Sequence, residues 1–332
     1  MINLKNKRIL KFNKVKNNVG NILLSCFTAK KYPLYCFFID ALKDFDISST
    51  IYLGNKKKSE FQNYFENYLI ISSLKKNNKQ KVLKILKKFK IKLVIPTSDL
   101  ELVFWSSNKN FFKRNKIEIL ISNKSSIINC QDKYKFEKYC IDRKIPAVKI
   151  VNFLKNKEKF NCVIKERFAQ HKKKALINVP FNKVNILKLK FKNPIIQKYI
   201  KGKEISADIW IDDIKKENNK IVLRERSEVV DGESKVTTII HEQKIEKEIL
   251  NYANKLNLKY HILIQAIIDN KKKIHIIECN PRFGGASTAS IKAGLPSVYN
   301  SIYKMLNSKQ RHFSTINRSF SKQFKLENVF YK

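Results

Sequence analysis

Glycine is scarce in this chain of 332 residues, which contains seven glycines and seven prolines. No Gly-x-Gly-x-x-Gly motif follows the first apolar run, so the sequence does not support a dinucleotide site. The longest apolar stretches, such as residues 32–42, are too short and too interrupted to span a bilayer. Residues 1–5 lead into further charge without an apolar segment, so we expect no signal peptide.

The chain also lacks paired cysteines. Its six cysteines form no Cys-x-x-Cys motif and no zinc-like cluster with the five histidines. Most of them lie inside apolar runs, where a free cysteine behaves as a small buried hydrophobic residue. This usage fits a reducing compartment, and we expect a cytoplasmic location.

Arginine is rare although the chain is strongly basic, with a formal net charge of +41. Nine of the 69 basic residues are arginines, and the lysines are spread along the whole chain. A nucleic-acid-binding surface would gather arginine and lysine with aromatic residues between them. The even spread, with abundant isoleucine and asparagine, favours the bias of an AT-rich genome. A polyanion-binding surface, an acidic protein partner and an anionic membrane surface are the alternatives.

The first part of the chain alternates apolar and amphipathic segments, which predicts a small doubly wound α/β domain. We interpret residues 19–29 and 79–90 as helical. The apolar runs that we interpret as strand-like cover residues 8–12, 34–39, 91–95 and 117–121.

After residue 131 the pattern changes to many short strands with interspersed helices, which predicts an α+β architecture. The predicted strands cover residues 161–165, 194–200, 205–211, 221–225, 236–240, 262–269 and 273–279. The predicted helices cover residues 132–143, 245–256 and 297–306. From residue 310 the tail is polar and basic, and we expect it to be partly disordered.

The most informative motif is residues 276–285, Ile-Ile-Glu-Cys-Asn-Pro-Arg-Phe-Gly-Gly. Because side chains alternate along a strand, Glu278 and Asn280 should share a face. They would offer oxygen ligands suited to Mg2+ on a nucleotide polyphosphate. We expect Arg282 to continue this face and to supply a planar cation for phosphate oxygens.

Several other residues are candidates for the same site. Lys133 begins a predicted helix, where a cation can reach a phosphate, and Lys165 ends an apolar strand. If the two strands before and after residues 270–272 pair as a hairpin, Gln265 lies beside Glu278. Taken alone, Lys133 and Lys165 are better explained as ordinary lysines of a solvated turn and a strand end, and Gln265 is as compatible with an exposed side chain.

A second group of candidates follows the strand at residues 194–200. The backbone of a hinge there could meet the edge of adenine, and Glu204, two residues past Gly202, could accept hydrogen bonds from a ribose. Arg224 and Arg226 should share a face and form a bidentate anion site.

Taken in order, these motifs resemble those of ATP-grasp ligases, and most closely the group similar to the large subunit of carbamoyl phosphate synthase. The resemblance covers residues 95–306 and includes Ile-Pro-Thr-Ser-Asp-Leu-Glu-Leu at 95–102 and Cys-Gln-Asp-Lys at 130–133. It implies a pre-ATP-grasp domain in residues 1–122 and an ATP-grasp domain in residues 123–309. The latter would hold a lid at about 148–200 and a C-terminal subdomain at about 201–309, and 310–332 would be a basic tail.

The resemblance also implies roles for residues. Mg2+, or Mn2+, would be held by Gln265, Glu278 and Asn280. Phosphate contacts would come from Lys133, Lys165 and Arg282, the last two being catalytic. The remaining residues that it implies are Gln197, Lys198, Tyr199 and Ile200 at the adenine hinge, Glu204 at the ribose, and Arg226 and Lys235 near the acceptor substrate.

The resemblance implies an ATP-dependent carboxylate–amine or carboxylate–thiol ligase, and it suggests a homodimer. One departure stands against it, because residues 166–175 hold no glycine where the family has a flexible glycine-rich loop. Lys172, Lys173 and Lys174 could hold the phosphates by charge, or catalysis has been lost. The alternatives are therefore an inactive ATP-binding regulatory protein and, from charge alone, a polyanion- or nucleic-acid-binding protein.

Overall fold

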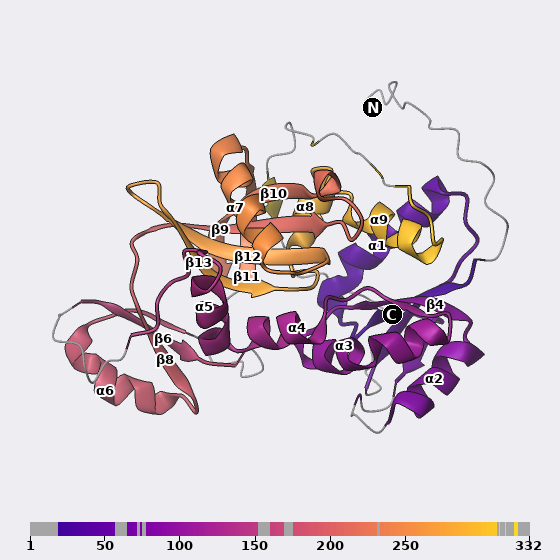
Figure 1. The fold of residues 1–332 in the computed structure, drawn as a ribbon, viewed down its shortest axis with the longest axis horizontal. Coiled ribbons are helices and arrows are strands. Elements are labelled where there is room, and N and C mark those ends of the chain that lie inside the picture. Colours follow the sequence, from indigo (N-terminus) through magenta and orange to yellow (C-terminus); the bar gives the residue numbers. More distant parts are fainter. Residues whose placement is uncertain are drawn as a thin grey trace.

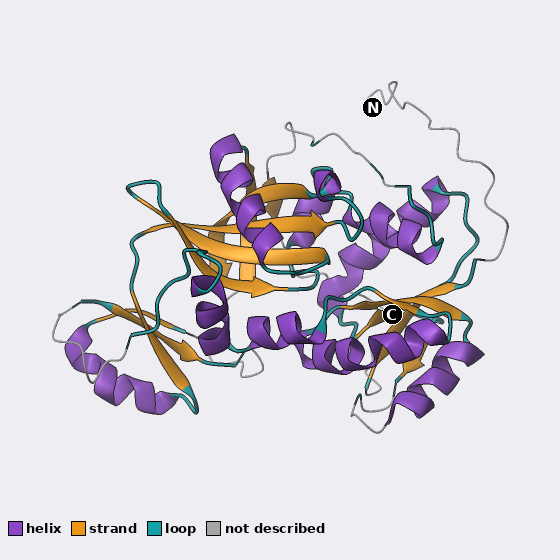
Figure 2. Ribbon diagram, viewed as in Figure 1, coloured by secondary structure: helices purple, strands orange, loops and turns teal. Residues whose placement is uncertain are grey.

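The structure is a computed structural model that describes residues 19–56, 65–71, 74, 78–151, 160–168, 175–230, 233–310, 312, 316 and 322–324. It contains three sheets of five, six and three strands. In Figure 1 the three-stranded sheet lies at one end of the molecule, the five-stranded sheet lies at the other, and the six-stranded sheet lies between them. Figure 2 shows the helices that flank each sheet.

The N-terminal sheet is parallel, with the strand order β3-β2-β1-β4-β5. Its strands are β1 (Asn21–Ser25), β2 (Ile51–Asn55), β3 (Tyr68–Ile70), β4 (Ile91–Pro96) and β5 (Glu118–Ile119). The helices around it are α1 (Tyr32–Asp44), α2 (Lys79–Lys88) and α3 (Asp99–Arg114). This parallel sheet with helices confirms the expected α/β class, and α2 and β4 match the predicted segments.

Two predictions in this region were wrong. Residues 19–29 do not form a helix, because β1 occupies Asn21–Ser25. Residues 34–39 lie within α1 rather than in a strand. Ile22, Leu23 and Leu24 are all fully buried, as in a parallel strand that is covered on both faces. Such a strand shows no alternation of apolar and polar residues from which it could be predicted. The predicted apolar run at 8–12 lies outside the described residues.

The six-stranded sheet is antiparallel between neighbours, with the order β13-β12-β9-β10-β11-β14. Its strands are β9 (Gly202–Ile211), β10 (Lys220–Val230), β11 (Glu233–Ile240), β12 (Tyr260–Asp269), β13 (Ile274–Asn280) and β14 (Lys322–Phe324). Helix α7 (Gln243–Lys255) buries Ile245, Ile249 and Ala253 in one core with apolar side chains of β9 and β12. All five strands and the helix that the sequence predicted here are confirmed. The short strand β14 was not predicted, since we expected a basic tail there.

The smallest sheet has the order β7-β6-β8 and carries its own core of Cys162, Ile164 and Val184 with three further apolar residues. Its elements are β6 (Cys162–Glu166), β7 (Leu176–Val179), α6 (Val184–Leu187) and β8 (Pro194–Lys198). We call this part of the molecule the lid. Short 3-10 turns lie at Ala29–Lys31, Phe181–Lys183, Lys188–Lys190 and Lys216–Asn218.

The remaining helices join the sheets. They are α4 (Lys124–Gln131), α5 (Lys133–Ile141), α8 (Ser287–Lys292) and α9 (Ser297–Met305). One core cluster contains Leu24 of β1, Phe38 of α1, Trp210 of β9 and Ile302 of α9, so the parallel sheet and the six-stranded sheet share buried side chains. Figure 1 shows α1 and α9 lying side by side at this junction. Within the described residues, no helix has the length and apolar character needed to cross a membrane.

Candidate functional site

One face of the six-stranded sheet gathers the predicted oxygen ligands. Gln265 pairs with Glu278 in the β12–β13 ladder, which confirms the predicted hairpin and places the two side chains together. On the other side of β12, Ile267 pairs with Glu204 of β9 and Gln265 pairs with Ser206. Because Glu204 and Ser206 share a face of β9, the carboxylates of Glu204 and Glu278 lie on the same side of the sheet.

Glu278 is held as a carboxylate at this face. The side-chain amide of Asn280 donates to Glu278 Oε1 at 2.9 Å. Burial alone would raise the pKa of Glu278, but the charges of Lys133 and Lys165, the Asn280 hydrogen bond and Arg282 together lower it. The cations that lower this pKa come from the lid, from α5 and from the turn after β13.

Lys165 lies at the lid side of the site. It is on β6, opposite Ile195 of β8, and 9% of it is exposed. Burial lowers its pKa to about 8, with Lys133 acting in the same direction and with Glu278 and Glu204 opposing the shift. The sequence predicted a buried strand that ends in this lysine. The buried strand is confirmed, and it continues by one residue to Glu166.

We expected Arg282 to continue the face of β13. It does not, because the strand ends at Asn280 and Arg282 lies in the following turn. Its Nη2 donates to the carboxylate of Asp99, the first residue of α3. Its Nη1 donates to the carbonyl of Phe283 at 3.2 Å. Its Nε is buried and has no hydrogen-bond partner within the described residues. A buried donor without a partner is costly, so this nitrogen is suited to an anionic ligand.

The two arginines of β10, Arg224 and Arg226, have different partners. Arg226 donates to Glu204 and, at 3.3 Å, to Gln265 Oε1, so it lies at the site. Arg224 is 2% exposed and bonds to the buried carboxylate of Asp208. The predicted bidentate anion site of Arg224 and Arg226 is therefore wrong, because Arg224 is paired with Asp208 inside the core. Lys235 lies on β11, which β9 and β10 separate from β12.

The predicted adenine hinge, residues 197–200, covers the end of β8 and part of the connection to β9. The Gln197 side chain is buried and donates to the Val148 carbonyl at 2.7 Å, so it bonds within the protein rather than facing a cleft. Lys198 Nζ lies 5.4 Å from the centre of the Phe160 ring. The Tyr199 amide donates to the Asn161 carbonyl at 2.8 Å, and Ile200 is half-buried.

The first turn of α5 connects the lid to the site. Asp132 caps this helix by accepting from the amides of Tyr134 and Lys135 at 3.1 and 3.4 Å. The same carboxylate accepts from Nε and Nη2 of Arg167, both at 2.7 Å, and Arg167 directly follows β6. This arrangement holds Lys133 near Lys165. The loop lysines Lys172, Lys173 and Lys174 lie outside the described residues.

The oxygen donors of the site are few. Within the described ranges, no group of three or more histidine, cysteine, aspartate or glutamate residues is placed to hold a metal ion. The set consists of the Glu278 carboxylate with the amide oxygens of Asn280 and Gln265. Such a set resembles a site in which Mg2+ takes most of its ligands from a nucleotide and water.

Sequence reasoning missed the partners that hold Arg282 and its turn. Asp99 was part of a quoted motif but was given no role, and Asp208, His261 and Ser287 were not candidates. An available signal was the acidic residue after Ser98, since Ser-x-x-Glu marks a helix start at the carboxyl end of a strand. For Asp208 the only signal was an acid inside an otherwise apolar strand.

Comparison with known proteins identifies similar folds and one matching family model. Residues 190–324 match the family model described as "ATP-grasp in the biosynthetic pathway with Ter operon". No curated protein that was compared matches the chain.

Among solved structures, a biotin carboxylase from Campylobacter jejuni in complex with beta-gamma-ATP has a TM-score of 0.65 at 11% identity, covering 88% of this chain and 72% of that one. An L-amino acid ligase from Bacillus licheniformis has a TM-score of 0.65 at 14% identity, covering 88% and 75%. The N5-carboxyaminoimidazole synthetase from Staphylococcus aureus with ADP has a TM-score of 0.65 at 15% identity, covering 92% and 82%.

The fold combines a parallel N-terminal sheet, a lid and an antiparallel six-stranded sheet. The resemblance to the ATP-grasp superfamily is confirmed: the chain has the ATP-grasp fold, and residues 190–324 carry the family match. The narrower likeness to the carbamoyl phosphate synthase group stays a prediction.

Proposed function

We propose that this chain is an ATP-dependent ligase that joins a carboxylate to an amine, or to a thiol, through an acylphosphate. The observation that supports this most directly is the convergence of Lys133, Lys165 and Arg282 on Glu278. Three cations around one carboxylate and two amides suit a triphosphate with its metal ion. The similar structures include an L-amino acid ligase and enzymes bound to beta-gamma-ATP or ADP, which agrees with the proposal.

The residues present fit a magnesium nucleotide. Glu278 is ionised, and Asn280 uses its amide nitrogen on Glu278, which leaves its oxygen for a ligand. Gln265 would add a second amide oxygen, although Arg226 now donates to it. When bound, Mg2+ would neutralise charge on the phosphate oxygens.

In the proposed reaction, an oxygen of the carboxylate substrate attacks the γ-phosphorus of ATP and ADP leaves. The amine then attacks the carbonyl carbon of the acylphosphate and inorganic phosphate leaves. Lys165 and Arg282 act by position and charge, because both are held in place before the ligand arrives. We propose Glu204 for the ribose and residues 197–200 for the adenine edge, with Arg226 and Lys235 toward the acceptor.

We also propose the domain limits at residues 122/123 and 309/310 and a cytoplasmic location. The six free thiols agree with a reducing compartment.

The first test is the release of ADP and phosphate from MgATP in the presence of pooled carboxylic acids and amines. We expect pool-dependent release that falls at least about 100-fold in Glu278→Gln, because the carboxylate is removed without a change of shape. Unchanged unfolding by urea would show that the variant folds. Wild-type turnover by Glu278→Gln would refute the assignment.

A second candidate is an ATP-binding regulatory protein without turnover. The specific observation in its favour is the absence of glycine from residues 166–175. Calorimetric binding of MgATP without ADP release across the substrate pools would support this candidate over the ligase.

A further inference from the structure

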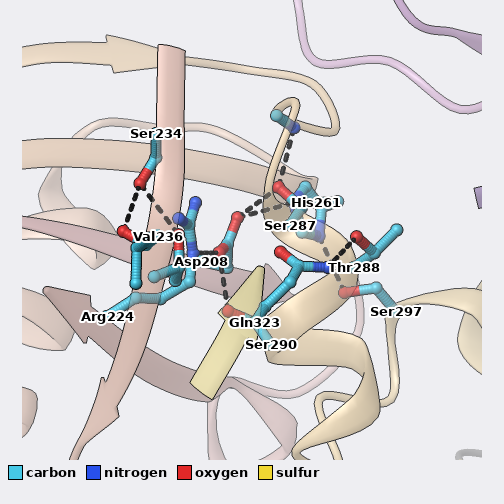
Figure 3. A network of polar contacts seen from close by, with 12 residues as sticks. Asp208, Arg224, Ser234, Val236, His261, Ser287, Thr288, Ser290, Ser297 and Gln323 are labelled. Carbon is cyan, nitrogen blue, oxygen red and sulfur yellow. Dashed lines mark hydrogen bonds and ion pairs between the residues drawn. The ribbon is translucent and has the colours of Figure 1, made fainter. Parts of the chain in front are cut away.

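A buried polar network lies next to the candidate site on the same face of the six-stranded sheet. Glu204, Ser206 and Asp208 alternate along β9, so the face that carries the site at Glu204 reaches Asp208 four residues later. We call Asp208, Arg224, His261, Ser287, Ser290 and Ser297 the Asp208 network. Figure 3 shows Asp208 among Arg224, His261 and the serines of α8.

Asp208 accepts hydrogen bonds from buried side chains of the protein. Arg224 Nε and Ser290 Oγ donate to Asp208 Oδ2, the latter at 2.7 Å, and Ser287 Oγ donates to Asp208 Oδ1. His261 Nε2 lies 3.2 Å from Asp208 Oδ1, and its Nδ1 lies 2.9 Å from Ser297 Oγ. Asp208 is 0% exposed, so a carboxylate here is stable only with these donors in place.

This network reaches the turn that follows β13 at two points. The Gly284 amide donates to Ser287 Oγ at 2.7 Å. The Phe283 ring is stacked on the His261 imidazole, with ring centres 4.1 Å apart and planes inclined by 12°. A Cβ on Gly284 would lie 2.6 Å from Leu263 Cδ2 and 2.9 Å from Ser287 Oγ, so glycine permits this close approach.

Arg282 directly precedes these two anchored residues. Its Nη1 donates to the carbonyl of Phe283, so its guanidinium position depends on the orientation of that peptide. Its Nε is buried without a partner within the described residues, so the turn and the bond of Nη2 to Asp99, rather than a bond to Nε, determine where this nitrogen points.

We propose that Ser287 is a positioning residue for Arg282: its hydroxyl donates to Asp208 and accepts the Gly284 amide, and this fixes the turn that presents the guanidinium to the ligand. The inference rests on the proposed function, because Arg282 is assigned there to the transferred phosphoryl group. It adds that a buried serine with no expected contact to substrate controls the rate.

The chain offers a matched control. Ser287 and Ser290 both lie on α8, are 1% and 0% exposed, and both donate to Asp208. Only Ser287 also accepts a hydrogen bond from the turn. The variants Ser287→Ala and Ser290→Ala therefore both remove a hydroxyl from the same carboxylate. They differ in the contacts of Ser287 Oγ to the Gly284 amide and to His261 Nε2, which lies 3.2 Å away.

The first measurement is hydrogen exchange of the Gly284 amide and the Arg282 Nε–H by NMR, without nucleotide, in the full chain. We expect exchange to be at least about tenfold faster in Ser287→Ala and changed less than about twofold in Ser290→Ala. Equal exchange in the two variants would overturn the proposal. If Ser287→Ala does not fold, Ser287→Cys, whose thiol is a weaker acceptor, should give an intermediate acceleration.

The second measurement is ADP release. We expect Ser287→Ala to lower kcat about 10- to 100-fold with KM for MgATP changed less than about twofold, and Ser290→Ala to keep the wild-type kcat. In an Arg282→Ala background, Ser287→Ala should cause no further loss, because the two act through one group. An equal loss in both backgrounds would overturn the positioning role. Absence of ADP release in the wild type would refute the proposed function instead, and the exchange measurement would still decide the role of Ser287.

Discussion

Lys165 carries an ammonium group in a buried position within the electrostatic field of Glu278 and Lys133. Burial lowers its pKa from its usual value to about 8, so the folded protein holds this proton less tightly than the unfolded chain does. A shift of this size corresponds to a cost of about 3 kcal/mol for keeping the lysine charged at neutral pH. Such a cost is expected where a cation is kept for a ligand rather than for the fold.

Replacing Lys165 by methionine should therefore separate stability from activity. We expect Lys165→Met to raise the free energy of unfolding at pH 7 by about 1 to 3 kcal/mol, reduced by the loss of a partner for Glu278. The gain should be complete below pH 8 and should shrink as the pH rises toward the unfolded pKa of about 10.4. Urea unfolding at several pH values measures it, and ADP release should fall at least about 100-fold. A variant that is less stable at pH 7 would contradict this account.

At the scale of elements, helix α5 and strand β6 are tied by one carboxylate. Asp132 caps α5 and forms a two-bond ion pair with Arg167, and Asp132 also bridges to Phe168 through the backbone. Burial would raise the pKa of Asp132, but the Arg167 guanidinium and the two helix amides lower it. The first turn of α5 and the lid are thus positioned together, which sets the relation of Lys133 to Lys165.

We expect Asp132→Ala to lower the free energy of unfolding by about 1 to 2 kcal/mol at pH 7, because the helix loses its cap and the ion pair. Arg167→Met keeps the cap, and it should cost less than about 1 kcal/mol because the Arg167 side chain is 37% exposed. Since the native pKa of Asp132 is lowered, its contribution is full above about pH 4 and is lost as the pH falls further. Urea unfolding at pH 7 and pH 3 tests this. Equal losses at both pH values would contradict it.

At the scale of the whole molecule, Arg282 of the six-stranded sheet unit is paired with Asp99 of the parallel-sheet unit. Lys31 Nζ also donates to the Phe283 carbonyl at 3.2 Å, so the turn after β13 lies against the N-terminal unit. The two units also share one cluster of buried apolar side chains.

Breaking the Asp99 pair should affect both stability and turnover. We expect Asp99→Asn to cost about 1.5 to 3 kcal/mol of unfolding free energy and to slow ADP release. Asp213→Asn is a matched control, because the Lys304–Asp213 pair has exposed fractions of 18% and 15%, close to the 18% and 16% of Arg282–Asp99. The control should lose comparable stability and retain turnover. Equal loss of turnover in both variants would show a general effect of instability.

The net charge of +41 also acts on the whole molecule. If the charge reflects composition rather than a binding surface, added salt should screen self-repulsion and raise Tm by a few degrees between about 0.05 and 0.5 M NaCl. Scanning calorimetry measures this. Tight DNA or RNA binding with a steep loss of affinity over the same salt range would instead favour a nucleic-acid-binding protein.

Much of the site could be predicted because its determinants are local. Alternation along β13 and the hairpin at residues 270–272 bring Glu278, Asn280 and Gln265 together, and both patterns lie within a few residues. The helices α2, α7 and α9 and most strands of the large sheet follow from periodicity in the same way. Near residues 21–44 this kind of prediction failed, because the predicted helix is strand β1 and the predicted strand lies in helix α1. Burial of β1 on both faces removes the alternation on which the prediction of a strand depends.

The sequence by itself thus determined the fold class, the buried lysine and the pairing of Gln265 with Glu278, the candidate oxygen ligands. Only the tertiary structure decided the surroundings of the arginines. Arg282 pairs with Asp99, which lies 183 positions away in the sequence. Arg224 pairs in the core with Asp208, which also accepts hydrogen bonds from two serines of α8 that lie 79 or more positions from it. A guanidinium has no local preference among distant carboxylates, so the packing of sheets and helices determines which carboxylate it meets. For this reason the sequence could not show that Arg224 pairs inside the core whereas Arg282 lies at the candidate site.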